Sequence, residues 1–219
     1  MPTKQQISDL EGEIPGIGVY VGISGTDYLI DQVLPTAMLL NAFILPGNVL
    51  SVAAGRISFI FGFRGPSLAV DTACSASIVS THVATRAMQV GDIFAALSCG
   101  VSAIMSVLTS GLFTAAGMLS PEGRCKTLDA SANGYVRGEA RGVIFIECIG
   151  RHTFSRTMSF CVFVIGSSVN QDGRSSSLTA PNGPSQQSVI CAALRDTNLD
   201  ATDVTNLQMH GTGTPLGDP

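Results

Sequence analysis

One cysteine, Cys74, stands where a thiol can act as a nucleophile. Gly65 and Pro66 predict a turn, and the apolar run 67–70 that follows has the length of a buried strand. Across residues 76–90 the apolar positions recur at steps of three and four, which predicts a helix. Cys74 therefore lies between a strand and a helix, where unpaired backbone N–H groups and the helix dipole favour the thiolate. Such a turn also places the side chain at the edge of the sheet, within reach of a substrate.

Other interpretations of Cys74 stay open on the residues alone. Most free cysteines are small buried hydrophobes that do no chemistry. A cysteine hydrolase would also use such a thiol, but it needs a base histidine and an Asn or Asp that orients this base. No acidic or amide residue stands directly beside His210, which disfavours the hydrolase.

Four segments resemble the β-ketoacyl synthase family, and they occur in the order found in that family. Residues 71–77 (DTACSAS) resemble its active-site cysteine motif, and residues 210–214 (HGTGT) resemble its first histidine motif. Between them, residues 169–173 (VNQDG) and 180–187 (APNGPSQQ) are similar to the ketosynthases of modular type I polyketide synthases. The resemblance runs from about Gly18 to the end of the chain.

The resemblance implies a thiolase-like α/β fold, in which two similar halves stack as five layers (α/β/α/β/α). Predicted strands that alternate with predicted helices favour an α/β protein with a mostly parallel sheet. We expect residues 1–219 to form a partial ketosynthase domain, with most of the N-terminal half and the start of the C-terminal half. The family's first strand would precede Met1 and its second histidine would follow Pro219, so both ends are expected to be cut.

The hydrophobic pattern predicts the elements around the cysteine. The predicted strands are 17–23, 67–70, 94–101, 143–148, 160–169 and one that ends at 207–210. The predicted helices are 48–61, 76–90 and 184–194, with short turns at 27–33 and 200–203.

The polar, Gly-rich stretch 128–142 resembles the loop that lies near the family's active site. Its Gly138-Glu139-Ala140 departs from the family's usual Gly-Glu-Gly. The segment 149–160 is also shorter than its counterpart in modular synthases.

The chemistry that the resemblance implies is a decarboxylative Claisen condensation. Cys74 would hold an acyl chain as a thioester, because sulfur attacks a thioester readily and also leaves readily. His210 would stabilise the enolate that forms when a malonyl-type extender loses CO2. The other two histidines do not fit these roles. His82 lies two helical turns, about 12 Å, along the axis from Cys74, and His152 lies in a basic segment far from any motif.

The resemblance also implies the partners. An acyl carrier protein would bring acyl and malonyl-type thioesters on its phosphopantetheine, and the domain would need no cofactor or metal of its own. The complete domain would form a homodimer in which strand 67–70 pairs with its copy across a two-fold axis. The fragment by itself is expected to acylate Cys74 without forming a carbon–carbon bond. The alternative is a non-condensing thiolase-fold partner or scaffold, although such partners typically lack the cysteine.

Composition excludes several further classes of protein. Charged residues make up 13% of the chain and the formal net charge is −4, so no basic face favours nucleic acid or an acidic membrane. The six cysteines show neither a C-x-x-C pair nor a metal-type spacing, which favours reduced thiols in a cytoplasmic protein. The apolar stretch 93–108 is interrupted by serines and a glycine, and predicts protein core rather than a membrane span.

Overall fold

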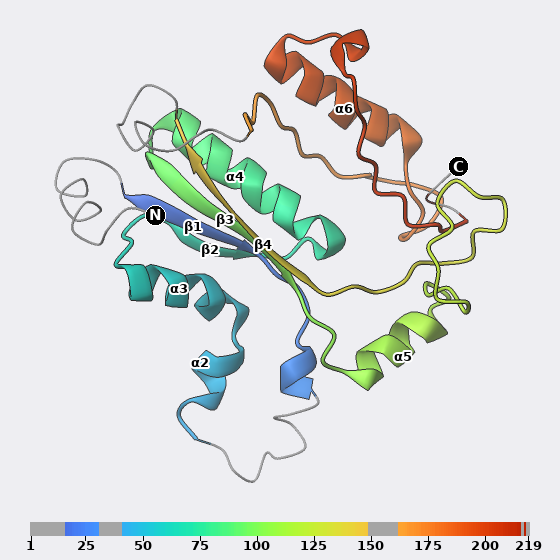
Figure 1. Ribbon diagram of the computed structural model, residues 1–219, viewed down its shortest axis with the longest axis horizontal. Coiled ribbons are helices and arrows are strands. Elements are labelled where there is room, and N and C mark those ends of the chain that lie inside the picture. The colour runs from blue at the N-terminus through green and yellow to red at the C-terminus, as the bar shows by residue number, and fades with distance from the viewer. Residues whose placement is uncertain (1–15, 31–40, 149–161, 216, 218–219) are drawn as a thin grey trace. The chain divides into compact units, whose positions relative to one another are not determined.

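The computed structural model describes residues 16–30, 41–148, 162–215 and 217, and it divides the chain into two compact units (Figure 1). The first unit takes the described residues up to Ser106 together with 138–148. The second unit takes 107–137 together with the described residues from Val162 onward. The sheet belongs to the first unit.

A four-stranded sheet of order β2-β1-β3-β4 forms the centre of the first unit. Its strands are β1 (Ile17–Gly22), β2 (Ser67–Val70), β3 (Ala95–Ser102) and β4 (Ala140–Glu147). β1 pairs in parallel with β2 and with β3, whereas β4 is antiparallel to β3. The expectation of a mostly parallel sheet therefore holds for three strands and not for the edge strand. β4 starts at the sheet edge where β3 ends, so it can run back beside β3 without a crossover.

Two helices cover opposite faces of this sheet (Figure 1). The helices are α3 (Leu50–Phe61) and α4 (Ala76–Val90). Successive residues of β1 face them in turn, as the two-residue period of a strand requires. Val19 and Val21 pack with Ala54 of α3, and Tyr20 packs with Ala84 and other residues of α4. All six residues of β1 are buried because both faces are covered.

Two strand glycines allow the first turn of α4 to lie directly on the sheet. A Cβ atom on Gly22 would lie 2.5 Å from the backbone nitrogen of Ser77, and a Cβ atom on Gly100 would lie 2.6 Å from the Ser77 Cβ. Real Cβ atoms do not approach that closely. Any larger residue at either position would push the start of α4 away from the sheet.

The second unit contains the helices α5 (Val107–Ala115) and α6 (Gly183–Thr197) and the short 3-10 helix η5 (Ala201–Asp203). The side chain of Asn182 accepts a hydrogen bond from the Ser185 N–H at the start of α6, and Asn198 ends the helix in the left-handed conformation, with φ of 56°. The short helix α2 (Ile44–Asn48) precedes α3 in the first unit.

The hydrophobic pattern predicts most of these elements to within a few residues, and the boundaries of β2 and α4 match. It misses the short helix α2 and the helix α5, which has Gly111 in its middle and no acidic residue in its first turn. The strands expected at 160–169 and 207–210 are wrong, because the described residues of both stretches form no ladder with another described segment. The turn expected at 27–33 is helical over 27–30, and its remaining residues lie outside the described ones, as do residues 160 and 161.

Within the described ranges, no helix is long and apolar enough to cross a membrane.

We expect Gly100→Ala to lower the free energy of unfolding by about 1–3 kcal/mol, the usual range for overpacking a core. The added methyl group would meet the Ser77 Cβ. Gly142 is the matched control, since it pairs with Gly100 across β3 and β4 and a Cβ atom there meets nothing within 4 Å. Urea denaturation followed by circular dichroism measures both variants. Equal stability of the two would show that α4 does not press on Gly100.

Candidate active site

Four loops meet at one edge of the sheet in the first unit. β1, β2 and β3 are parallel, so their C-terminal ends lie together there, and antiparallel β4 begins at the same edge. Cys74 follows β2 at this edge. The loops after β1 and β3 and the residues just before β4 accompany it. Of the Gly-rich stretch 128–142, only residues 138–142 belong to this unit, and they lie at this edge at the start of β4.

Cys74 lies in a strained turn between strand and helix. It is the middle residue of the short 3-10 helix η3 (Ala73–Ser75), and its side chain is exposed. Ala73 has φ of 52°, a left-handed conformation that costs a residue other than glycine about 1–2 kcal/mol. A strained strand-to-helix turn of this kind raises a nucleophilic side chain above the sheet edge.

Side chains of the turn itself hold this conformation. The Ala73 N–H donates to Asp71 Oδ1 at 3.0 Å, and Ser75 Oγ donates to the Thr72 carbonyl at 2.9 Å. Among the described residues, no side chain caps the start of α4. The N–H of Ala76, the first residue of α4, donates instead to the Ala73 carbonyl of the turn.

Two carboxylates accept hydrogen bonds from the backbone of the loop after β3 at the same edge. Glu139 Oε1 accepts a hydrogen bond from the Ile104 N–H at 2.7 Å, and Asp27 Oδ2 accepts one from the Met105 N–H at 3.4 Å. Sequence reasoning did not assign these roles to Asp27 or Glu139. The available signal was an acidic residue just after one predicted strand and another just before a second, in a chain with few charges.

His210 lies in the second unit and precedes a loop shaped by two glycines. Gly211 and Gly213 have φ of 54° and 72°, in the region that favours glycine. The Gly211 carbonyl accepts from Thr127 Oγ1 at 2.6 Å, and the Gly213 carbonyl accepts from the Gly134 N–H at 2.9 Å. His210 is exposed at the start of this loop. Thr127 and Gly134 are the supports that sequence reasoning missed.

The structure places each of the two predicted site residues on its own scaffold, with Cys74 in the first unit and His210 in the second. His82 lies two turns along α4 from the cysteine and is half-buried, as the helical pattern predicts. His152 lies outside the described residues.

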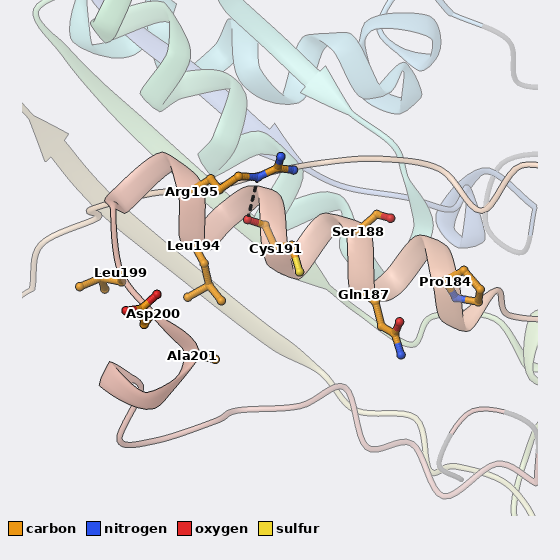
Figure 2. A pocket seen from close by; sticks show the side chains of 9 residues that line it. All are labelled: Pro184, Gln187, Ser188, Cys191, Leu194, Arg195, Leu199, Asp200 and Ala201. Carbon is orange, nitrogen blue, oxygen red and sulfur yellow. Dashed lines mark hydrogen bonds between the residues drawn. The ribbon is translucent and has the colours of Figure 1, made fainter.

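A separate groove runs along α6 in the second unit (Figure 2). Within it, Arg195 Nε donates to the Cys191 carbonyl at 3.3 Å. The lining residues are Pro184, Gln187, Ser188, Cys191, Leu194, Arg195, Leu199, Asp200 and Ala201. Neither Cys74 nor His210 is among them, so this groove is distinct from both candidate site residues.

Comparison with known families agrees with the motifs. Residues 3–149 match the N-terminal domain of the β-ketoacyl synthases, and residues 161–219 match the C-terminal domain. The chain therefore belongs to the β-ketoacyl synthase family, whose ketosynthase structures share its thiolase-like fold.

Among curated proteins, the chain is 44% identical over 204 residues to one subunit of the phenolphthiocerol/phthiocerol polyketide synthase of Mycobacterium tuberculosis. It is 42% identical over 202 residues to the polyketide synthase GfsB of Streptomyces halstedii. These alignments cover 92% of this chain but 9% and 4% of the two relatives. The chain thus spans less than a tenth of the length of either synthase.

Solved ketosynthases have a similar structure. The ketosynthase from module 6 of the Bacillus subtilis bacillaene synthase matches with a TM-score of 0.81 at 32% identity. The oxazolomycin ketosynthase domain OzmH KS7 of Streptomyces albus matches with a TM-score of 0.86 at 29% identity. Each match covers 99% of this chain and 36% of the solved chain.

We expect Cys74 to react first with limiting iodoacetamide at pH 7.5. Burial raises the pKa of the Cys99 thiol, so less of it is thiolate at this pH. Cys125 is exposed, but its Sγ accepts the Val136 N–H at 3.2 Å. Cys191 is exposed within helix α6 and serves as the internal reference.

Peptide mass spectrometry of the folded chain measures the order of labelling. Faster labelling of Cys191 or Cys125 than of Cys74 would contradict the assignment of Cys74 as the activated thiol.

Proposed function

We propose that the chain forms the part of a polyketide synthase ketosynthase that accepts the acyl group, and that Cys74 is the nucleophile. The observation that carries this proposal is the exposed Cys74 thiol on a strained turn, at the sheet edge where four loops meet. A thiol that served only as core would lie buried, as Cys99 does. Membership of the β-ketoacyl synthase family supports the same assignment.

The first step is the transfer of an acyl group from one sulfur to another. The Cys74 thiolate attacks the carbonyl carbon of an acyl thioester carried on the phosphopantetheine of an acyl carrier protein. A new carbon–sulfur bond forms at Cys74, the carrier's carbon–sulfur bond breaks, and the carrier thiol leaves with a proton.

The second step joins two carbon atoms. A malonyl-type thioester loses CO2, and the electron pair of the broken bond becomes an enolate. The α-carbon of this enolate attacks the acyl carbonyl on Cys74, a carbon–carbon bond forms, and the Cys74 thiolate leaves. His210 donates a hydrogen bond to the enolate oxygen, where the negative charge develops.

Acyl transfer to the purified chain tests the first step. We expect mass spectrometry to show one hexanoyl group on Cys74 after incubation with the hexanoyl thioester of N-acetylcysteamine. Cys74→Ala should abolish this adduct, whereas Cys191→Ala, the matched exposed thiol, should retain it. Acylation that persists in Cys74→Ala would refute the assignment of Cys74.

His210→Ala tests the second step in the same preparation. The acylation of Cys74 should stay within about twofold, because His210 acts after this step. The release of CO2 from malonyl carrier protein should fall by about 10²-fold or more, the usual cost of one oxyanion donor. Loss of acylation together with CO2 release would place His210 in the first step instead.

We also propose that the assembled domain is a homodimer that pairs β2 with its copy. β2 is an edge strand bonded only to β1 within the described sheet, and Leu68 on it is 44% exposed. An exposed edge strand leaves a row of N–H and C=O groups that a second copy can satisfy.

We therefore expect Ala69→Pro, which removes one N–H from β2, to shift a dimer toward monomer in light scattering. The N–H that Pro removes lies on the exposed edge of β2, and the sequence of β1 is unchanged. Ala115→Pro, at the last position of α5 in the other unit, is the control and should leave the mass unchanged. A monomer in the unsubstituted protein at micromolar concentration would contradict the dimer.

A further inference from the structure

Three hydroxyl groups meet in the interface between α4 and β3. Ser80 and Thr81 come from α4, and Ser98 comes from β3. Ser98 Oγ lies 3.2 Å from Ser80 Oγ and 2.9 Å from Thr81 Oγ1. Ser80 is fully buried and Ser98 is 3% exposed. Hydroxyls buried this deeply must hydrogen-bond with one another or with the backbone.

The protons of these groups can be assigned so that each finds an acceptor. Ser80 donates to Ser98, Ser98 donates to Thr81, and Thr81 donates to the Ser77 carbonyl at 2.9 Å. The Ser77 carbonyl also lies 2.8 Å from Ser80 Oγ, which can donate to it directly. We call Ser80, Ser98 and Thr81 the hydroxyl chain. It ends on the backbone of the first turn of α4.

This end point lies close to the nucleophile. Ser77 is the second residue of α4, three residues after Cys74, and it rests on Gly22 and Gly100. Hydrogen bonds among Asp71, Thr72, Ala73 and Ser75 hold the turn that carries Cys74. These bonds lie within the turn and do not tie it to the sheet. The position of the turn relative to the sheet therefore depends on where α4 begins.

Apolar contacts and hydrogen bonds constrain the helix in different ways. Ala84 and Met88 pack α4 against β1 and β3, but burial of apolar surface has no direction and permits small rotations of a helix. Hydrogen bonds are directional and weaken steeply when they are misaligned. The hydroxyl chain therefore sets the rotation of the first turn of α4, and with it the direction in which Cys74 points.

We propose that the hydroxyl chain positions Cys74 for acyl transfer. This inference rests on the proposed role of Cys74 as acyl acceptor. Ser80, Thr81 and Ser98 do not touch the reacting atoms, so they are positioning residues. Their effect appears in reactions that demand a defined approach to the thiol, and much less in reactions that do not.

Thr85 provides a matched control on the same helix. It is 8% exposed, and its Oγ1 donates to the Thr81 carbonyl at 2.9 Å, so its hydrogen bond stays within α4. Thr85→Val removes a hydroxyl from α4 as Thr81→Val does, but it leaves the link to β3 intact. A role in stability alone would make the two variants alike.

The experiment compares two rate constants of Cys74 in each variant. One is acylation by the hexanoyl thioester of N-acetylcysteamine, which needs a defined trajectory, and the other is alkylation by iodoacetamide. We expect Thr81→Val and Ser98→Ala to slow acylation about tenfold, a cost typical of misplacement by a fraction of an ångström. Alkylation should change by less than about twofold. Thr81→Ser, which keeps the hydroxyl, should restore acylation, and Thr85→Val should not alter the ratio.

An unchanged ratio in both Thr81→Val and Ser98→Ala, or an equal fall in Thr85→Val, overturns the inference. We expect Ser98→Ala to fold, because the hydroxyls of Ser80 and Thr81 can still donate to the Ser77 carbonyl. Thermal melts establish that each variant is folded. Absence of acylation in the unsubstituted chain would instead refute the proposed function, and the inference with it.

Discussion

The contact between the first turn of α4 and the sheet is the constraint on which the rest of the site depends. Gly22 and Gly100 bring the backbone of Ser77 down onto the strands. This contact sets the height of α4, and the hydroxyl chain sets its rotation. The turn that holds Cys74 joins β2 to this helix, and Ala73 within the turn has a left-handed conformation. The strained turn and the close packing thus lie together at the start of α4.

The two units hold the two candidate site residues in similar ways. In each, the chain leaves regular structure and its backbone takes positive φ values, at Ala73 beside Cys74 and at Gly211 beside His210. Hydrogen bonds from nearby polar side chains hold these conformations. Asp71 does this for the cysteine turn, and Thr127 does it for the histidine loop. Rigid support of a strained loop keeps an exposed side chain in a defined position.

Local patterns were enough to predict the elements that flank the cysteine. The boundaries of β2 and α4 follow from a short apolar run and a helical period, and neither needs a distant partner. Residues 162–169 and 207–210 have apolar patterns that suggested strands, yet they form no ladder with described residues, and a strand exists only through pairing. α5 was not predicted because its glycine and its apolar surroundings obscure the helical period in the sequence.

The sequence by itself determined which residues are the candidates for the site. Cys74 and His210 were predicted from residue type and motif, since a thiol and an imidazole are properties of single residues in short segments. Only the tertiary structure decided what supports them. Ser98 meets Ser80 and Thr81 only because β3 lies against α4, and Gly100 matters only because Ser77 lies above it. Contacts between segments far apart in the chain leave no periodic trace in the sequence, so their role had to be found in space.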